Sequence, residues 1–120
     1  MPKKIISIDQ GTTNSRAVLF DEKCNLIDYA QKEITQYYPS EGWVEHDPEE
    51  IWKSVFGVTN EIISKHKLSS TEVGAIGITN QRETTILWDK RTGKSVYPAI
   101  VWQDRRTSSL CQKLKDEGLT

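Results

Sequence analysis

The residues of this chain that could most readily do chemistry lie in a polar turn, DQGTTNS, at positions 9–15. Gly11 lets the backbone come close to a ligand, and the turn adds three hydroxyls and several backbone N–H groups that can bind phosphate oxygens. Asp9, at the end of the preceding apolar run, is a hard oxygen ligand that suits Mg²⁺ directly or through water. The alternative is a polar hairpin turn whose Asp and Thr side chains satisfy their own backbone.

Two further polar clusters, NQRE at 80–83 and QDRR at 103–106, each follow directly on an apolar run. Ligands of open α/β sheets collect at the carboxyl ends of strands, so these clusters and Asp9 could line one cleft. An Arg beside a Glu, as at Arg82 and Glu83, offers paired donors and acceptors for the two hydroxyls of a polyol. A surface ion pair between them, of little energetic weight, is the alternative.

The residues around the polar turn predict a β-hairpin. Short apolar runs at 5–8 and 17–20 flank it and are too short for helices. After a second turn, residues 26–33 mix apolar and polar residues, as expected for a third antiparallel strand with one face exposed to solvent. The aromatic loop at 37–43 follows, and we expect its Trp43 to cover an edge of the core.

A long helix is predicted next. Asp47 suits the N-cap, Pro48 suits the first helical position, and Glu50 has the spacing of a capping box. Basic residues at 65–67 complement the macrodipole at the helix end. The apolar stripe predicted to face the core consists of Ile51, Trp52, Val55, Phe56, Ile62 and Ile63, with Thr59 on the same face.

The second half of the chain predicts more strands and a last helix. Residues 73–79 are nearly all apolar or Gly, which favours a strand buried on both faces and closely approached by a helix. Segments 84–89 and 95–97 predict a hairpin, and 99–102 a further strand. The final helix is predicted from Thr107 to Glu117, with Leu110, Cys111 and Leu114 inward and Gly118 as its stop.

These elements predict an α/β fold in which three antiparallel strands are followed by a crossover helix and a buried strand. At 120 residues the chain is one domain or a piece of one, and its net charge of −1 gives no basic field for nucleic acid. No apolar run approaches the roughly 20 residues of a membrane span, and the start lacks the core of a signal peptide. We therefore expect a cytoplasmic protein with Cys24 and Cys111 reduced and partly buried.

His46 and His66 lie apart in the sequence and have no matching set of ligands around them. We interpret both as structural or solvated side chains.

Four motifs in order resemble the FGGY family of carbohydrate kinases. They are DQGTTNSR at 9–16, GWVEHDP at 42–48, GITNQRETT at 77–85 and VWQ at 101–103. The resemblance runs from end to end of the chain and is strongest to the members that phosphorylate glycerol. It implies an actin-like ATPase, or ribonuclease H-like, fold of which residues 1–120 form the N-terminal part of the first domain.

The resemblance also implies roles for single residues on the nucleotide side. Thr12, Thr13 and Asn14 would meet the phosphates of ATP, Arg16 would sit beside the nucleotide, and Asp9 would help to hold Mg²⁺. The family often has Ser where this chain has Asn14, so an amide stands here in place of a hydroxyl.

On the substrate side, the resemblance implies that Arg82 and Glu83 bond the hydroxyls of glycerol and that Trp102 packs against its carbon chain. The reaction would move the γ-phosphoryl group of MgATP to glycerol and give sn-glycerol 3-phosphate. Family members are several times longer, and their general-base Asp lies beyond Thr120, so no catalytic residue is expected here and residues 1–120 alone should be inactive.

Two alternatives remain open at this stage. The first is another FGGY kinase that acts on a different sugar or polyol, and the second is a non-catalytic binding module of the actin-like group. Unpaired strand edges and uncovered apolar surface should also make residues 1–120 self-associate in isolation.

Overall fold

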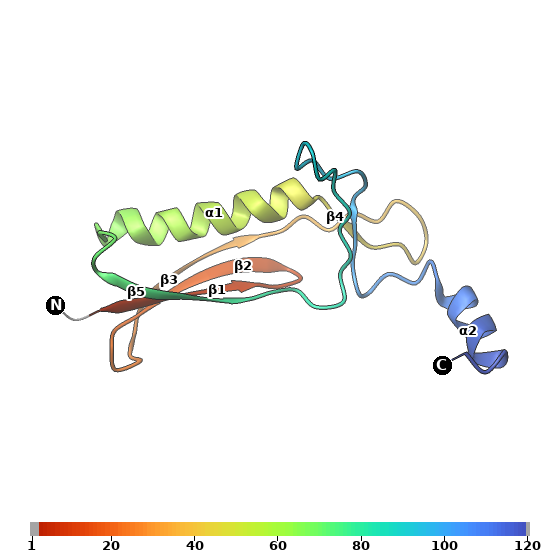
Figure 1. Ribbon diagram of the computed structural model, residues 1–120, viewed down its shortest axis with the longest axis horizontal. Helices are drawn as coiled ribbons and strands as arrows, with labels where there is room; N and C mark the ends of the chain where they lie inside the picture. Colours follow the sequence, from red (N-terminus) through yellow and green to blue (C-terminus); the bar gives the residue numbers. More distant parts are fainter. Residues whose placement is uncertain (1–2, 120) are drawn as a thin grey trace.

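The computed structural model describes residues 3–119. One long helix runs along one face of a sheet, and a second helix stands apart at the far end of the molecule (Figure 1). The elements in chain order are β1 (Lys4–Gln10), β2 (Asn14–Phe20), β3 (Leu26–Glu33), β4 (Glu45–His46), α1 (Pro48–Lys65), β5 (Val73–Thr79), β6 (Ala99–Ile100) and α2 (Ser108–Asp116). Within residues 3–119, none of the helices has the length and apolar character that a membrane crossing requires.

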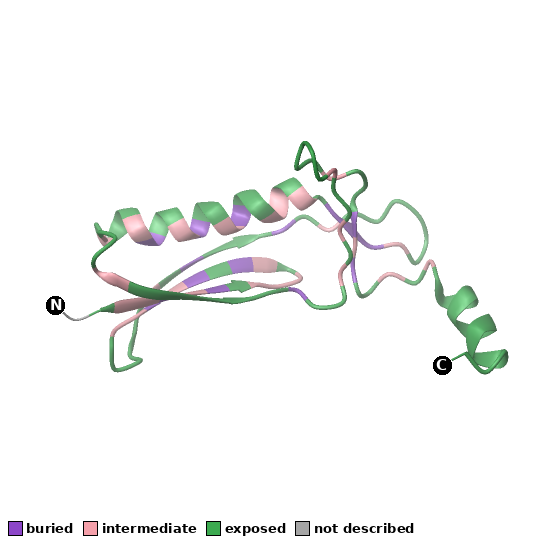
Figure 2. Cartoon of the chain, viewed as in Figure 1, coloured by how far each residue is buried: buried purple, intermediate pink, exposed green. Residues whose placement is uncertain are grey.

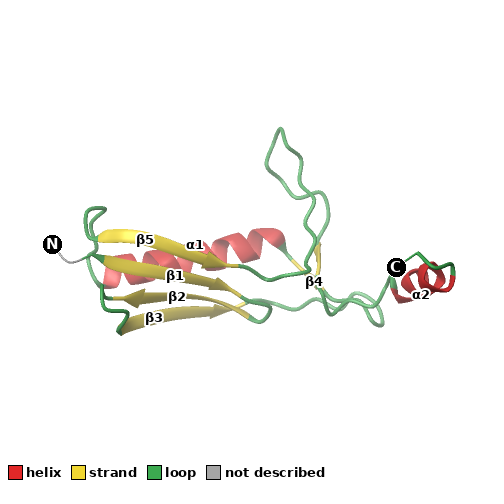
Figure 3. Ribbon diagram, turned by 60° about the horizontal axis from the view of Figure 1, so that its bottom comes forward, coloured by secondary structure: helices red, strands yellow, loops and turns green. Residues whose placement is uncertain are grey.

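The main sheet has the strand order β3-β2-β1-β5. Strands β1, β2 and β3 pair antiparallel, whereas β5 pairs parallel to β1 after α1 has crossed over the sheet. Figure 2 shows buried residues where α1 faces the strands, and Figure 3 shows the strands side by side. The three antiparallel strands, the crossover helix and the α/β class predicted from the sequence are confirmed.

The core lies between α1 and the inner face of the sheet. Its apolar side chains come from alternate positions of the strands and from one side of the helix, as the two periodicities require. They are Ile6, Ile8, Ala17, Leu19, Ala30, Val58 and Ile62.

The N-terminus of α1 forms at the predicted residues. The Oδ1 of Asp47 accepts from the backbone N–H of Glu49 at 3.0 Å, and Pro48 occupies the first turn. The predicted capping box does not form. The carboxylate of Glu50 instead accepts from the N–H of Thr35 at 2.7 Å and from the hydroxyl of Tyr37 at 3.2 Å. The loop after β3 thus offers Glu50 donors that lie outside its own helix.

The predicted buried stripe of α1 is partly wrong. Trp52 and Phe56 are 62% and 58% exposed, and their rings lie 5.8 Å apart on the outer face. The face that meets the sheet contains Ser54, whose hydroxyl bonds the buried hydroxyl of Ser15 at 2.7 Å. An assignment based on apolar spacing does not recognise this face, because a paired serine is as well satisfied in the core as an apolar residue.

The prediction that residues 73–79 are buried on both faces is also wrong. Strand β5 forms an edge of the sheet, and Ile76 and Ile78 are 52% and 73% exposed. No helix approaches its glycines among the described residues: Gly74 lies against the side chain of Lys3, and the space around Gly77 is open. The apolar sequence of β5 therefore faces solvent in this chain.

The segment from 84 to 102 folds less regularly than predicted. The hairpin is reduced to a bridge between Trp88 and Ser95, closed by Gly93 at φ +73°. The strand predicted at 99–102 shortens to β6, which pairs antiparallel with β4. β4 and β6 thus form a second, two-stranded sheet beside the first.

Helix α2 ends at the predicted stop, where Gly118 has φ +76°. Its predicted inward face is wrong, because Leu110 is 54% and Leu114 37% exposed and, within residues 3–119, the helix stands apart from the other elements with none of its residues buried (Figure 2). Cys111 and Cys24 are free and exposed rather than partly buried.

Candidate functional site

A hollow of about 430 Å³ opens at the carboxyl ends of β1 and β5. The two strands run parallel, with Asp9 beside Thr79 in register, so the loops that leave them emerge at the same edge of the sheet. The segment after β6 closes the third side. The lining residues are Asp9, Gln10, Gly11, Thr12, Asn80, Gln81, Arg82, Glu83 and Trp102.

Hydrogen bonds between distant segments fix the shape of this hollow. The N–H of Gly11 donates to the carbonyl of Asn14 at 2.9 Å and closes the turn. A Cβ at position 11 would lie 3.1 Å from that carbonyl oxygen, so the tight turn suits glycine. The Nε1–H of Trp102 donates to the hydroxyl of Thr12 at 2.9 Å. Gln10 accepts from the backbone N–H of Gln81 at 3.3 Å.

Arg82 and Glu83 are exposed and line the same hollow as the turn. The ion pairs of the described residues do not include one between these two side chains. Glu83 adopts φ +55°, a left-handed conformation that a non-glycine residue holds only at a cost of about 1 kcal/mol or more. Both side chains are therefore free to bond a ligand, and one of them is held in a strained backbone.

The remaining residues predicted to meet the nucleotide do not line the hollow. Thr13 is exposed, and its carbonyl accepts from the N–H of Ile34 at 2.9 Å. The amide of Asn14 points to the hydroxyl of Thr13 at 3.5 Å. Arg16 turns toward β3, where its guanidinium bonds Gln31 at 2.9 Å and 3.2 Å and lies 5.5 Å from the ring centre of Tyr29.

The polar cluster at 103–106 serves the fold more than the hollow. The guanidinium of Arg106 bonds Asp104 and Glu45, both at 2.8 Å, and lies 3.8 Å from the ring centre of Trp43. The side-chain hydrogen bonds from Arg106 lower the pKa of Asp104 to about 2. Asp104 also accepts from the N–H of Val44 at 2.6 Å, so the cluster ties the segment after β6 to β4.

Two carboxylates line the hollow, those of Asp9 and Glu83, and Asp9 is the one at the turn. Residues 3–119 contain no cluster of three or more His, Cys, Asp or Glu side chains that could hold a metal by themselves. The exposed carboxylate of Asp9 fits Mg²⁺, which keeps several waters and is held mainly by the phosphates of its nucleotide.

Both histidines make structural contacts. His66 bonds Asp28 at 2.9 Å at the end of α1, where the neighbouring Lys65 forms an ion pair with the same carboxylate at 2.7 Å. These contacts hold the pKa of Asp28 well below its usual range. His46 is fully buried and contacts Gln36 at 2.7 Å.

Three glutamines near the hollow escaped sequence reasoning. Gln36 donates to the carbonyl of Thr12 at 2.9 Å, and Gln10 and Gln81 bond each other across the two loops. Gln81 is 7% exposed, although it lies two residues after the exposed strand β5. Its place inside the NQRE motif was the one signal that could have singled it out, and Gln36 offered none.

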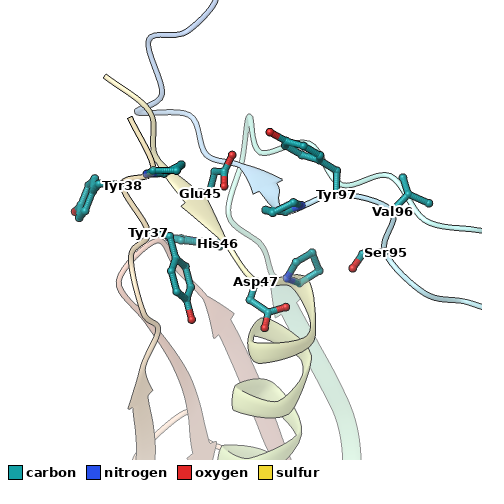
Figure 4. A pocket seen from close by; sticks show the side chains of 11 residues that line it. Tyr37, Tyr38, Glu45, His46, Asp47, Ser95, Val96 and Tyr97 are labelled. Carbon is teal, nitrogen blue, oxygen red and sulfur yellow. The ribbon is translucent and has the colours of Figure 1, made fainter. Parts of the chain in front are cut away.

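A larger hollow, of about 720 Å³, lies beside the start of α1 (Figure 4). Side chains of three tyrosines, Tyr37, Tyr38 and Tyr97, contribute to its wall, and His46 and Asp47 border it. None of the predicted site residues lines it. Five of the predicted site residues line the smaller hollow instead, namely Asp9, Thr12, Arg82, Glu83 and Trp102.

Residues 4–120 match the model of the N-terminal domain of the FGGY family of carbohydrate kinases. The chain belongs to this family. Among curated relatives, this FGGY chain is 62% identical over 119 residues to the glycerol kinase of Fusobacterium nucleatum, covering 98% of this chain and 24% of that protein. It is 56% identical over 117 residues to the glycerol kinase of Carboxydothermus hydrogenoformans, covering 98% of this chain and 23% of that protein.

Solved structures give the same family. The FGGY chain superposes on Plasmodium falciparum glycerol kinase with ADP at a TM-score of 0.89 and 40% identity, covering 97% of this chain and 23% of that one. Ligand-bound xylulose kinase from Lactobacillus acidophilus follows with a TM-score of 0.87 and 25% identity, covering 98% and 23%. The chain thus spans about a quarter of the length of the relatives it matches.

Proposed function

We propose that this chain forms the N-terminal part of an ATP-dependent glycerol kinase. The whole protein would transfer the γ-phosphoryl group of MgATP to a terminal hydroxyl of glycerol and release sn-glycerol 3-phosphate. The observation that carries the proposal is the shared hollow: the Thr12 turn and the Arg82–Glu83 pair, far apart in sequence, line the same space. A phosphate site and a polyol site must adjoin in this way if a phosphoryl group is to pass between them.

The turn after β1 supplies the phosphate side of the proposed site. Thr12 presents a hydroxyl whose position is fixed by the donor from Trp102, and Gly11 leaves room for a phosphate to approach the backbone. Asp9 would hold Mg²⁺, directly or through water. Bound Mg²⁺ neutralises charge on the transferring phosphate.

Thr13, Asn14 and Arg16 do not line the hollow, so a nucleotide would have to extend beyond it to contact them. The guanidinium of Arg16 would also have to leave Gln31. We therefore place Thr12 and the backbone at Gly11 nearest to the transferring phosphate.

Arg82, Glu83 and Trp102 supply the substrate side. The guanidinium donates and the carboxylate accepts, so the pair can bond two neighbouring hydroxyls of one polyol and fix its orientation. The indole ring of Trp102, 54% exposed in the hollow, offers an apolar face to a short carbon chain. Orientation of the attacking hydroxyl is the contribution that these residues make to transfer.

Glycerol is favoured over the other substrates of the family. The chain is 56–62% identical to curated glycerol kinases of bacteria, against 25% to the xylulose kinase of similar fold. A non-catalytic module would have no use for a strained Glu83 beside a phosphate-type turn. The general base is expected beyond residue 120, and the cytoplasmic location remains a prediction.

A substrate assay on the full-length protein tests the proposal. With MgATP and a panel of polyols and sugars, phosphorylation of glycerol should exceed that of any pentulose. Glu83→Gln should raise the KM for glycerol by about tenfold or more, because a charged acceptor is lost, while the surface change Glu61→Gln should leave it unchanged. Absence of both glycerol turnover and calorimetric glycerol binding would overturn the proposal.

A further inference from the structure

The side chain of Gln36 sits behind the phosphate turn with both halves of its amide in use. Its Nε2 donates to the carbonyl of Thr12 at 2.9 Å and to the carbonyl of Ile34 at 3.0 Å. An amide nitrogen has two hydrogens, so both are committed. The oxygen of the amide is therefore the atom that faces His46, where the Oε1–Nε2 distance is 2.7 Å.

This arrangement fixes the tautomer of His46. An amide oxygen can only accept, so the imidazole must donate through Nε2–H, and its Nδ1 carries the lone pair. His46 is fully buried, and burial lowers its pKa, so the ring is neutral near pH 7. A neutral ring with one donor and one acceptor can link two different partners.

The side chain of Gln81 has an unpaired group that is complementary to the Nδ1 of His46. The oxygen of Gln81 accepts from Gln10 at 3.4 Å, so the Nε2 of Gln81 remains as a donor. The buried side-chain polar atoms without a partner, within residues 3–119, are this Nε2 and the Nδ1 of His46. Gln81 is close enough to act on the pKa of His46, although the two side chains stop short of hydrogen-bond geometry. One atom is a donor and the other an acceptor, so they are complementary.

We infer that His46 is a positioning residue that couples the two walls of the hollow. Through Gln36 it holds the carbonyl of Thr12. Through a bond from Gln81 to its Nδ1 it would hold the loop that carries Arg82 and Glu83. The inference rests on the proposed function for its consequence in catalysis. A small shift of either loop would complete the hydrogen bond between His46 and Gln81, and neither atom would have to give up another partner. The positions of the phosphate site and the polyol site would then depend on each other.

Two substitutions and a control test this coupling in the full-length protein. His46→Phe keeps an aromatic ring but removes both ring nitrogens, whereas His46→Gln keeps an N–H that can reach Gln36. His66→Phe is the control, because His66 contacts Asp28 at the other end of α1, away from the hollow. The readouts are the KM values for ATP and glycerol and the hydrogen–deuterium exchange of peptides covering 10–14 and 80–83.

His46→Phe should raise both KM values by about threefold to tenfold and speed exchange in both peptides. His46→Gln should restore slow exchange in 10–14, and His66→Phe should leave both peptides and both KM values unchanged. A change confined to one wall, or a loss of thermal stability with both KM values within about twofold of the wild type, would overturn the inference.

If His46→Phe does not fold, NMR spectroscopy of the wild-type protein tests the inference instead. In wild-type protein labelled with ¹⁵N-histidine, the His46 signal should show a protonated Nε2 and an unprotonated Nδ1 across neutral pH, and His46→Gln identifies the signal by removing it. The opposite tautomer overturns the coupling. A wild-type protein that shows this tautomer and coupled exchange but does not phosphorylate glycerol would refute the proposed function and leave the coupling standing.

Discussion

The indole of Trp102 and the hydroxyl of Thr12 join segments that are 90 positions apart in the chain. Both side chains line the hollow, and Trp102 lies on a segment with little regular structure of its own. Its position therefore depends on this hydrogen bond and on the neighbouring Asp104–Arg106 contacts. The residue proposed to pack against the substrate is thus held in place by the turn proposed to bind phosphate.

Trp102→Phe should weaken substrate binding by the full-length protein. The change keeps an aromatic ring but removes the N–H, and a neutral hydrogen bond contributes about 0.5–1.5 kcal/mol, so the KM for glycerol should rise by about twofold to tenfold. Trp88→Phe alters an exposed tryptophan outside the hollow and should leave the KM unchanged. Steady-state kinetics of both variants measure the difference, and equal KM values would contradict it.

Asp104 should contribute to the acid sensitivity of the fold. Hydrogen bonds from Arg106 lower its pKa to about 2 from an ordinary value near 4. A carboxylate with a lowered pKa adds stability that is complete above the ordinary value and is lost as the pH falls toward 2. Asp104→Asn should therefore flatten the fall of the unfolding free energy between about pH 4 and 2.

The same variant should be less stable than the wild type at pH 7 by about 1–3 kcal/mol, because Arg106 loses a charged partner in a largely buried cluster. Urea unfolding at a series of pH values compares the two proteins. Other carboxylates with lowered pKa, such as Asp28, act equally in both and cancel in the comparison. Parallel pH curves would show that Asp104 is not responsible.

Among the elements, those whose positions depend on local sequence could be predicted. The hairpin of β1 and β2, the third strand and the Asp47–Pro48 helix start all follow from short-range patterns. The parallel direction of β1 and β5 was also enough to predict that Asp9, Thr12 and the 80–83 loop lie at the same edge of the sheet. The prediction for β5 failed because an apolar sequence indicates that a strand can be buried. It does not show whether residues 1–120 contain an element that packs on that strand.

The site was less predictable than the fold for a physical reason. The roles of Gln36 and His46 depend on side chains that meet across loops, and no periodicity encodes such meetings. Glu50 likewise bonds a strand end in place of its own helix. Arg16 belongs to a motif that implies a nucleotide contact, yet its side chain bonds Gln31 on the neighbouring strand β3.

The end of α1 offers a test at this scale. Lys67 follows the helix at φ +49°, and the N–H of Leu68 donates back to the carbonyl of Ile63 at 3.0 Å, a helix ending that usually uses glycine. Lys67→Gly should stabilise the chain by about 0.5–1 kcal/mol. Lys53→Gly, inside α1, should destabilise it by about 1 kcal/mol. Chemical denaturation of both variants checks the opposite signs, and a loss of stability in Lys67→Gly contradicts the assignment.

At the scale of the molecule, the chain is elongated. It measures 60 × 30 × 28 Å with a radius of gyration of 18.3 Å, whereas a compact domain of this length has about 13.6 Å. Apolar side chains stay exposed on β5, on the outer face of α1 and on α2. This is the surface that an isolated chain would bury against other copies of itself.

Residues 1–120 alone should therefore self-associate and show no kinase activity. Ile78→Lys places a charge on the exposed edge strand and should shift the protein toward monomer, because charged edges resist strand pairing. Leu110→Lys on α2 leaves the edge intact and should have a smaller effect. Light scattering over a range of concentrations measures this, and a monomeric wild-type chain would contradict the expectation.

The uncovered edge of β5 has a consequence during protein synthesis. The match to an N-terminal domain implies that these residues are made early, and in a protein as long as the relatives translation of the remainder would take on the order of tens of seconds. For that interval the nascent chain displays an apolar strand with unpaired backbone groups. Ribosome-associated chaperones that recognise extended apolar segments should hold it until later residues arrive, so Ile76 and Ile78 mark where crosslinking to such a chaperone is expected.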